Sequence, residues 1–159
     1  MNTRPIIIYT DGCCLGNPGK GGWAAILQTQ GKEKELSGGV RLTTNNRMEL
    51  LAVIKGLSAL KTSCSDVTIY TDSQLISNAI NEKWLYNWAS KNWRKTDNNP
   101  VLNVDLWEQI LELLKIHKVR FEWIEGHIGI QGNERCDVLC KNAAGNATDE
   151  DIDSVYEAK

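Results

Sequence analysis

Hydrophobic positions in the first part of the chain follow strand-like and then helix-like patterns. Ile6–Tyr9 is a continuous β-branched and aromatic run, which predicts a strand buried on both faces and central in a sheet. Residues 23–27 and 34–42 indicate two more strands, the second more polar and so nearer an edge, with a hairpin tip at Gly31-Lys32. Apolar residues at helical spacing then predict a helix over residues 45–60.

The second part of the chain alternates strands with helices. Residues 67–71 indicate a strand, and Ser73 is a suitable N-cap for a short helix. A longer apolar stripe predicts a helix over residues 101–117, and strict alternation predicts a strand over residues 119–123. A glycine-containing loop precedes a last helix at residues 133–144.

Hairpin strands followed by alternating strands and helices indicate an α/β fold with a mixed sheet covered by helices. We expect one domain over residues 1–146. Residues 147–159 contain five acids between Asp149 and Glu157 and are predicted to form a loosely held, solvated tail. Residues 12–22 are rich in glycine and predict a loop that brings backbone close to a ligand.

Two of the predicted strands end in nearly the same five residues. Ile8–Gly12 has the sequence IYTDG and Ile69–Ser73 has the sequence IYTDS. Each run therefore places an aspartate, Asp11 or Asp72, at the C-terminal end of a strand, where ligands collect in open α/β sheets. The two carboxylates are predicted to lie side by side.

Two further acids fall in the first turns of predicted helices, Glu49 in the first long helix and Asp137 in the last. Each has a structural alternative, because Glu49 could form a capping box with Asn46 and an acid near a helix start is favoured by the helix dipole. Clustered carboxylates repel one another unless a cation neutralises them, and hard oxygen ligands suit Mg²⁺ or Mn²⁺. Together the four acids therefore predict a site for these metals, of the kind that can hold two ions about 4 Å apart for phosphodiester chemistry.

Composition and charge narrow the class of protein. The chain has 159 residues, 42% of them hydrophobic, and a net charge of −2, which is typical of a single soluble domain. A nucleic-acid partner would have to be met by a local basic patch. No apolar run is long enough to span a membrane, so we expect no membrane partner.

The five cysteines are odd in number and follow no secretory signal, which favours reduced thiols in a cytoplasmic protein. Cys136 and Cys140 could share a helix face and join His127 at a zinc ion. No second ligand pair completes a set of four, so zinc is the less favoured interpretation.

Six motifs together resemble those of bacterial type I ribonucleases H, and the resemblance runs from about Ile6 to Ala144. The octet TTNNRMEL and the pentad NERCD are the most specific of them. The motifs are Tyr9–Gly12, Asn17–Gly19, Thr43–Leu50, Thr71–Gln74, Gly126-His127 and Asn133–Asp137.

The resemblance implies a five-stranded mixed sheet, with three antiparallel strands and then two parallel ones, flanked by helices. It implies sequence-independent endonucleolytic hydrolysis of the RNA strand of an RNA–DNA hybrid, leaving 5′-phosphate and 3′-OH, by two Mg²⁺ ions or by Mn²⁺ as a substitute. His127 would assist proton transfer or product release, for which an unperturbed histidine is suited. A monomer is the default assumption. The acids implied as catalytic metal ligands are Asp11, Glu49, Asp72 and Asp137.

Discrimination of RNA from DNA must depend on the 2′-OH. By resemblance, short polar side chains would line the minor groove of the hybrid, and for two of them, Asn45 and Asn46, helix capping is the structural alternative. The residues implied are Cys14, Asn17, Asn45, Asn46 and Gln74.

Half of the six tryptophans lie within ten residues, among lysines and an arginine. Trp84 and Trp88 are four residues apart and share a helix face, so a small packed helix with a core tryptophan is one interpretation. The resemblance implies a basic handle that grips the DNA strand, with Thr44 and Asn87 on a DNA phosphate. The implied handle residues are Trp84, Asn87, Trp88, Lys91 and Trp93.

Four residues depart from the pattern of the family. Ala89-Ser90 replaces consecutive basic residues, Leu42 stands where a basic residue is common, and Glu125 stands where lysine is familiar. Because each lost phosphate contact weakens affinity, we predict weaker, salt-limited hybrid binding. The alternatives to a nuclease of this family are a hybrid-binding module without catalysis, which would lack an acid, and another nuclease or strand-transferase of the same superfold, which would lack the handle.

Overall fold

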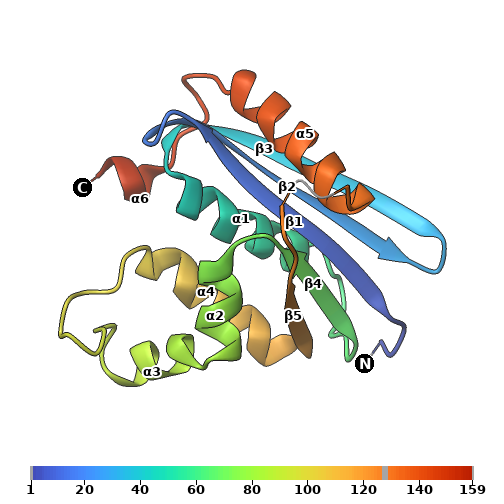
Figure 1. The fold of residues 1–159 in the computed structure, drawn as a ribbon, viewed down its shortest axis with the longest axis horizontal. Helices are drawn as coiled ribbons and strands as arrows, with labels where there is room; N and C mark the ends of the chain where they lie inside the picture. The colour runs from blue at the N-terminus through green and yellow to red at the C-terminus, as the bar shows by residue number, and fades with distance from the viewer. Residues whose placement is uncertain (1, 127–128, 159) are drawn as a thin grey trace.

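The computed structural model describes residues 2–126 and 129–158, which contain one mixed sheet of five strands (Figure 1). The spatial order is β3-β2-β1-β4-β5. Strands β1 to β3 are antiparallel neighbours, whereas β4 pairs in parallel with both β1 and β5, which confirms the predicted sheet. The strands are β1 Ile6–Leu15, β2 Gly19–Thr29, β3 Lys32–Thr43, β4 Val67–Thr71 and β5 Val119–Trp123.

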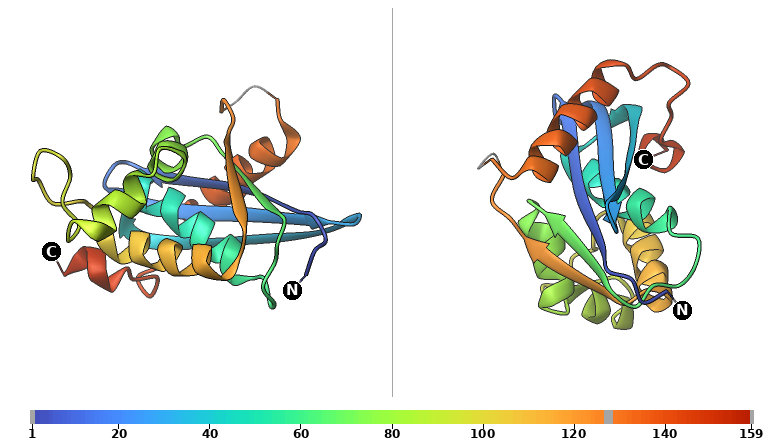
Figure 2. Two further views of the ribbon diagram at one scale, coloured as in Figure 1. Left: turned by 90° about the horizontal axis from the view of Figure 1, so that it is seen from below. Right: turned by 90° about the vertical axis from the view of Figure 1, so that its right-hand side faces the viewer.

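Helices cover both faces of the sheet (Figure 2). Helix α5 packs on β1, β2 and β3, while α1 packs on the opposite face of β1 and β2, with α4 against it. Figure 1 shows α2 and α3 beyond β4, on the side of the sheet away from α5. The helices are α1 Asn45–Ser58, α2 Gln74–Asn81, α3 Trp84–Ser90, α4 Val104–Ile116, α5 Gln131–Gly145 and α6 Ser154–Glu157. No helix among the described residues is long and apolar enough to cross a membrane.

The main core lies between the sheet and α1. Ile8 and Ile69 are paired across β1 and β4 and are both fully buried, as the continuous apolar runs predicted. Leu50, Val53 and Leu57 of α1 are also fully buried and belong to the same cluster. This buried interior therefore fixes the parallel segments of β1 and β4 that lead to Asp11 and Asp72.

The predicted glycine-rich loop is mostly strand. Strand β1 continues to Leu15 and β2 begins at Gly19, with Cys13 paired to Gly22. A Cβ atom at Gly22 would lie 2.0 Å from the carbonyl oxygen of Cys140. This glycine therefore serves the close packing of α5 on β2, a long-range demand that the local sequence does not reveal.

Helix bounds also differ from the predictions by a few residues. Helix α5 begins at Gln131, two residues before the predicted start, so Asp137 lies in its second turn and not in its first. Helix α4 begins at Val104, after Asn103 with a positive φ of 61°, which is why the helix does not start at residue 101.

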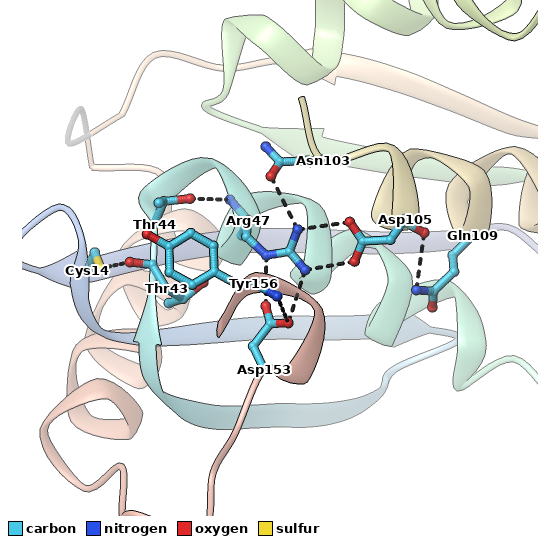
Figure 3. Close-up of polar contacts among 9 residues, drawn as sticks. All are labelled: Cys14, Thr43, Thr44, Arg47, Asn103, Asp105, Gln109, Asp153 and Tyr156. Carbon is cyan, nitrogen blue, oxygen red and sulfur yellow. Dashed lines mark hydrogen bonds and ion pairs between the residues drawn. The ribbon is translucent and has the colours of Figure 1, made fainter. Parts of the chain in front are cut away.

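The acidic C-terminal segment is held against the domain, which differs from the expected loose tail. The side chain of Arg41 on β3 forms an ion pair with Glu157 at 2.7 Å, and the backbone N–H of Arg41 donates to the carbonyl of Asp151. Arg47 of α1 pairs with Asp153 at 2.7 Å (Figure 3). These two arginines offset the acidic charge that predicted a solvated tail.

Candidate active site

An open cleft of about 490 Å³ lies where the parallel pairing of β1 with β4 ends, after Tyr9 and Tyr70. Because β1 continues to Leu15, Asp11 lies within this strand and not, as the sequence had predicted, at its C-terminal end. Asp11 is 4% exposed and belongs to β1, and Asp72 directly follows β4, which is paired with β1. Each of these aspartates offers a carboxylate oxygen, as does Glu49, and the three oxygens all lie within 4.8 Å of one another. The predicted proximity of Asp11 and Asp72 is therefore observed.

Glu49 is oriented toward the two aspartates and not toward the start of its own helix. The N-cap of α1 is Thr44, whose hydroxyl accepts from the N–H of Arg47. The Oε1 atom of Glu49 accepts from the N–H of Gly12 at 3.2 Å, so the capping-box alternative does not hold. Its Oε2 atom is buried and has no hydrogen-bond donor among the described residues. A buried carboxylate oxygen without a donor needs a proton or a cation.

Burial and mutual repulsion raise the pKa values of this cluster. The pKa of Asp11 is raised to about 7, mainly by burial and then by the charge of Asp72. Burial, followed by the charges of Asp11 and Asp72, raises the pKa of Glu49 well above its ordinary value. Because the donors are all hard oxygens and their charges repel, the cluster fits a hard divalent cation.

Asp137 belongs to a second ligand group that shares Asp11. Oxygens of these two acids and the sulfur of Cys140 all lie within 4.8 Å of one another. Lys141 places its Nζ atom 2.9 Å from Asp137 Oδ2 and neutralises part of the charge. We use "carboxylate cluster" below for the four predicted acids, Asp11, Glu49, Asp72 and Asp137.

Sequence reasoning missed three residues beside the cluster. Lys141 lies four residues after Asp137 on a helix, and the i, i+4 rule could have found it. Cys13 lines the cleft next to Asp11, and adjacency in sequence was its only signal. Cys140, considered in the sequence only as a possible face-mate of Cys136, lies beside Asp11, whereas Cys136 donates to the carbonyl of Tyr9.

Four predicted substrate-binding residues line the same cleft, namely Cys14, Asn45, Asn46 and Gln74. Asn17 is tied to them because its Oδ1 accepts from the N–H of Asn45 at 3.2 Å. Since Thr44 provides the side-chain cap, the side chains of Asn45 and Asn46 are not used in capping. The thiol of Cys14 donates to the carbonyls of Gly19 and Thr43, which fixes the edge of the cleft.

The structure describes all of the predicted handle residues, and none of them lines this cleft. They lie on and after α3, beyond α2 (Figure 1). Trp84 and Trp88 have ring centroids 6.3 Å apart, and Trp88 packs edge-on against the buried Trp107. Trp93 is also partly buried against the core, whereas Trp84 is 40% exposed. Asn87 and Lys91 are exposed, so α3 combines a packed face with an accessible one.

His127 lies outside the described residues. The loop that leads to it passes close to the carboxylate cluster, because a Cβ atom on Gly126 would lie 2.9 Å from Asp72 Oδ2.

A protein-family model and several sequence relatives match nearly the whole chain. Residues 3–145 match the protein-family model described as RNase H. A ribonuclease H of Nitratidesulfovibrio vulgaris is 53% identical over 146 residues, which cover 92% of this chain and 93% of that protein. A ribonuclease H of Syntrophus aciditrophicus is 56% identical over 144 residues, covering 91% of this chain and 83% of that one.

Solved structures show the same fold. LC9-RNase H1, described as a type 1 RNase H with the type 2 active-site motif, superposes with a TM-score of 0.81 at 29% identity, covering 93% of this chain and 75% of that one. LC11-RNase H1, solved in complex with an RNA/DNA hybrid, gives a TM-score of 0.66 at 24% identity, covering 88% of this chain and 96% of that one.

Proposed function

Because this chain belongs to the RNase H family, we propose that its carboxylate cluster holds the metal with which it cleaves RNA. The chain is a metal-dependent endoribonuclease that acts on RNA–DNA hybrids. The assignment of the four acids as ligands, and of Mg²⁺ as the ion, with Mn²⁺ as a substitute, is our proposal. The observation that carries it is Glu49 Oε2, a buried oxygen with no donor among the described residues, next to two further carboxylates.

The metal, when bound, supplies Lewis-acid stabilisation of the phosphoryl oxygens and lowers the pKa of water. The protein contributes the fixed geometry of the ligands. Gly12 holds Glu49 through its backbone N–H and also donates to Asp11 Oδ1 at 2.9 Å. Both carboxylates are thereby oriented before any ligand arrives, which reduces the reorganisation needed for binding.

A two-metal arrangement is supported by the two ligand groups that share Asp11. The first group adds Glu49 and Asp72 to Asp11, and the second adds Asp137 and the sulfur of Cys140. Lys141 partly neutralises Asp137 and would have to release it when a second ion binds. His127 is proposed, on the resemblance alone, to move a proton or to assist product release.

The cleft residues would read the RNA strand. Side-chain amides donate and accept hydrogen bonds, so Asn45, Asn46 and Gln74 can each contact a 2′-OH. We propose that Asn17 and Cys14 complete this edge, with Thr44 near a phosphate of the DNA strand. On the far side of α2, the exposed Trp84, Asn87 and Lys91 would hold the DNA strand, while Trp88 and Trp93 anchor α3 to the core.

Hydrolysis of a labelled RNA–DNA hybrid with Mg²⁺ tests the assignment of the acids. Outer-shell substitutions at metal sites cost about 10–100-fold, so Asp11→Asn, which alters a ligand common to both groups, is expected to lower the rate at least about a hundredfold. Glu108→Gln, on the exposed side of α4, is the matched control. Unchanged cleavage by Asp11→Asn would overturn the ligand assignment, and cleavage of duplex DNA by the wild type would overturn the strand preference.

We also propose a cytoplasmic location and a monomeric state. The first is supported by five free cysteines, because thiols stay reduced in that compartment. Light scattering of the purified protein at several concentrations tests the second, and a mass of twice the chain would contradict it.

A further inference from the structure

Asp72 is held in a different way from the other acids of the carboxylate cluster. Asp11 and Glu49 both accept from the backbone N–H of Gly12, at 2.9 and 3.2 Å. Asp137 has a lysine partner at 2.9 Å. Among the described residues, no donor contacts the carboxylate of Asp72. The direction of this carboxylate therefore depends on how the backbone of Asp72 is held.

The backbone of Asp72 lies between two regular elements. Strand β4 ends at Thr71 and α2 begins at Gln74, so Asp72 belongs to neither. The N–H of Ile124 donates to the carbonyl of Thr71 at 2.9 Å, one residue before Asp72. In the part of the chain that the structure describes, no backbone N–H donates to the carbonyl of Asp72 itself. This carbonyl therefore depends on a side chain for its hydrogen bond.

Trp123 supplies the hydrogen bond from the neighbouring strand. It is the last residue of β5 and is paired with Thr71. Its indole N–H donates to the carbonyl of Asp72 at 3.1 Å, so the side chain reaches one residue beyond the paired segment. An indole N–H is a donor only and matches a carbonyl oxygen, which only accepts.

The chain that follows Trp123 approaches the carboxylate of Asp72. A Cβ atom at Gly126 would lie 2.9 Å from Asp72 Oδ2, so the backbone of Gly126 lies against this side chain. The two contacts come from positions three residues apart and meet Asp72 at its carbonyl and at its carboxylate. Asp72 is therefore restrained at both ends by the segment that leaves β5.

We propose that Trp123 is a positioning residue for Asp72, and that its indole hydrogen bond directs the Asp72 carboxylate toward the metal. The proposal rests on the proposed role of Asp72 as a metal ligand. Trp123 does not line the cleft, so it acts through Asp72. Outer-shell partners of this kind orient the groups that bind a metal. Because the bond is neutral and holds the backbone, we expect it to change metal affinity roughly three- to tenfold.

The experiment compares Mn²⁺ binding by the wild type and by Trp123→Phe, without nucleic acid. Phenylalanine keeps an aromatic ring and removes the N–H. The EPR signal of free Mn²⁺ measures the dissociation constant, which is expected to rise roughly three- to tenfold in the variant. Thermal denaturation in a chelator is expected to give nearly the same midpoint for both proteins, because Trp123 is 44% exposed.

Trp84→Phe is the matched control, because Trp84 is 40% exposed and lies on α3, outside the cleft. It also removes an indole N–H and is expected to keep the Mn²⁺ affinity of the wild type. Equal affinities of the wild type and Trp123→Phe would overturn the positioning role, and so would an equal loss in Trp84→Phe. A large fall in the denaturation midpoint of Trp123→Phe would overturn it as well, because the indole would then support the fold as a whole.

Hydrolysis of the hybrid separates metal binding from the chemical step. The Mg²⁺ concentration that gives half of the maximal rate is expected to rise by the same factor in Trp123→Phe. The rate at saturating Mg²⁺ is expected to stay within about twofold of the wild type. A lower maximal rate with an unchanged Mg²⁺ requirement would contradict the positioning role. Failure of the ligand assignment would show differently, as an unchanged Mn²⁺ affinity in Asp72→Asn, and would overturn both proposals.

Discussion

At the scale of single residues, Asp11 is the side chain at which burial, charge repulsion and two candidate ligand groups coincide. It is almost fully buried, shared by two ligand groups and raised in pKa to about 7. Folding of the metal-free protein therefore favours the protonated form of Asp11. The stabilisation that comes from the proton on Asp11 is fully present below the ordinary pKa of 3.8. It is lost as the pH rises through the raised pKa of about 7.

Asp11→Asn removes this titration and is expected to stabilise the metal-free protein at pH 8. The gain in unfolding free energy is at most about 4 kcal/mol, since one pKa unit corresponds to about 1.4 kcal/mol. It is expected to be small at pH 4 and to grow up to pH 8. Urea denaturation in a chelator across this range measures it, with Glu108→Gln, on the exposed side of α4, as the control. A gain that did not change with pH would contradict the repulsion described here.

Arg47 shows how one buried side chain secures distant parts of the chain. Its guanidinium contacts Asp105 of α4 and Asp153 before α6, each at 2.7 Å, and Asn103 at 3.2 Å (Figure 3). The ring of Tyr156 lies 5.9 Å away. Arg47 directly follows Asn46, so the same network fixes the first turn of α1 at the cleft.

Arg47→Met is expected to lower the unfolding free energy by about 3 kcal/mol, because it removes a buried guanidinium and leaves two partly buried carboxylates unpaired. Arg41→Met is the matched control. Its side chain is 35% exposed, so its loss should cost about 1 kcal/mol or less. Urea denaturation of both variants measures the difference, and equal losses would refute the special role of the buried network.

At the scale of elements, the position of α5 depends on two glycines. A Cβ atom at Gly22 would lie 2.0 Å from Cys140 O, and one at Gly39 would lie 2.4 Å from Ala143 O. Both would push the helix away from the sheet. Helix α5 carries Asp137 and Cys140. The packing of this helix on β2 and β3 therefore determines how close these two residues lie to Asp11.

Gly22→Ala is expected to destabilise the fold by about 1–3 kcal/mol through overpacking and to raise the Mg²⁺ concentration needed for hydrolysis. Gly145→Ala, at the end of the same helix and with open space around it, should do neither. Thermal denaturation and Mg²⁺ titration of activity distinguish the two variants. A normal Mg²⁺ requirement in folded Gly22→Ala would show that α5 need not be held so closely.

At the scale of the whole molecule, a protein of net charge −2 must bring a polyanion to a cleft of carboxylates. Attraction therefore has to come from local basic residues. Helix α3 offers Lys83 before it and Lys91 after it, but Ala89 and Ser90 between them are neutral. We accordingly expect modest hybrid affinity.

Replacing Ala89 and Ser90 with lysine is expected to strengthen hybrid binding at low salt. Each new phosphate contact should steepen the slope of log K against log salt by up to about 0.9. Binding isotherms at several salt concentrations, with an uncleavable substrate or with Asp11→Asn, measure this slope. Thr62→Lys, at an exposed position between α1 and β4, adds charge outside the handle and should change the slope less. An equal change in both would place the DNA strand elsewhere.

The sequence by itself determined the sheet, the approximate helices and the proximity of Asp11 to Asp72. The physical reason is that apolar periodicity reports burial locally, and two similar runs that pair in parallel bring the residues that follow the paired segment to one place. The pairing of Trp84 with Trp88 followed from helical spacing in the same way. Motif resemblance added the groove residues, of which Cys14, Asn45, Asn46 and Gln74 share the cleft.

Only the tertiary structure decided features that join residues far apart in the chain. Arg47 and Asp153 are 106 positions apart, so no local pattern could turn the expected loose tail into a docked one. The start of α5, and with it the turn that holds Asp137, was likewise missed by two residues. Helical spacing predicts only that Cys140 could share a face with Cys136, whereas the packing of α5 on Gly22 places the Cys140 thiol beside Asp11. Helical spacing shows which residues share a face, but the close approach of two elements decides what that face meets.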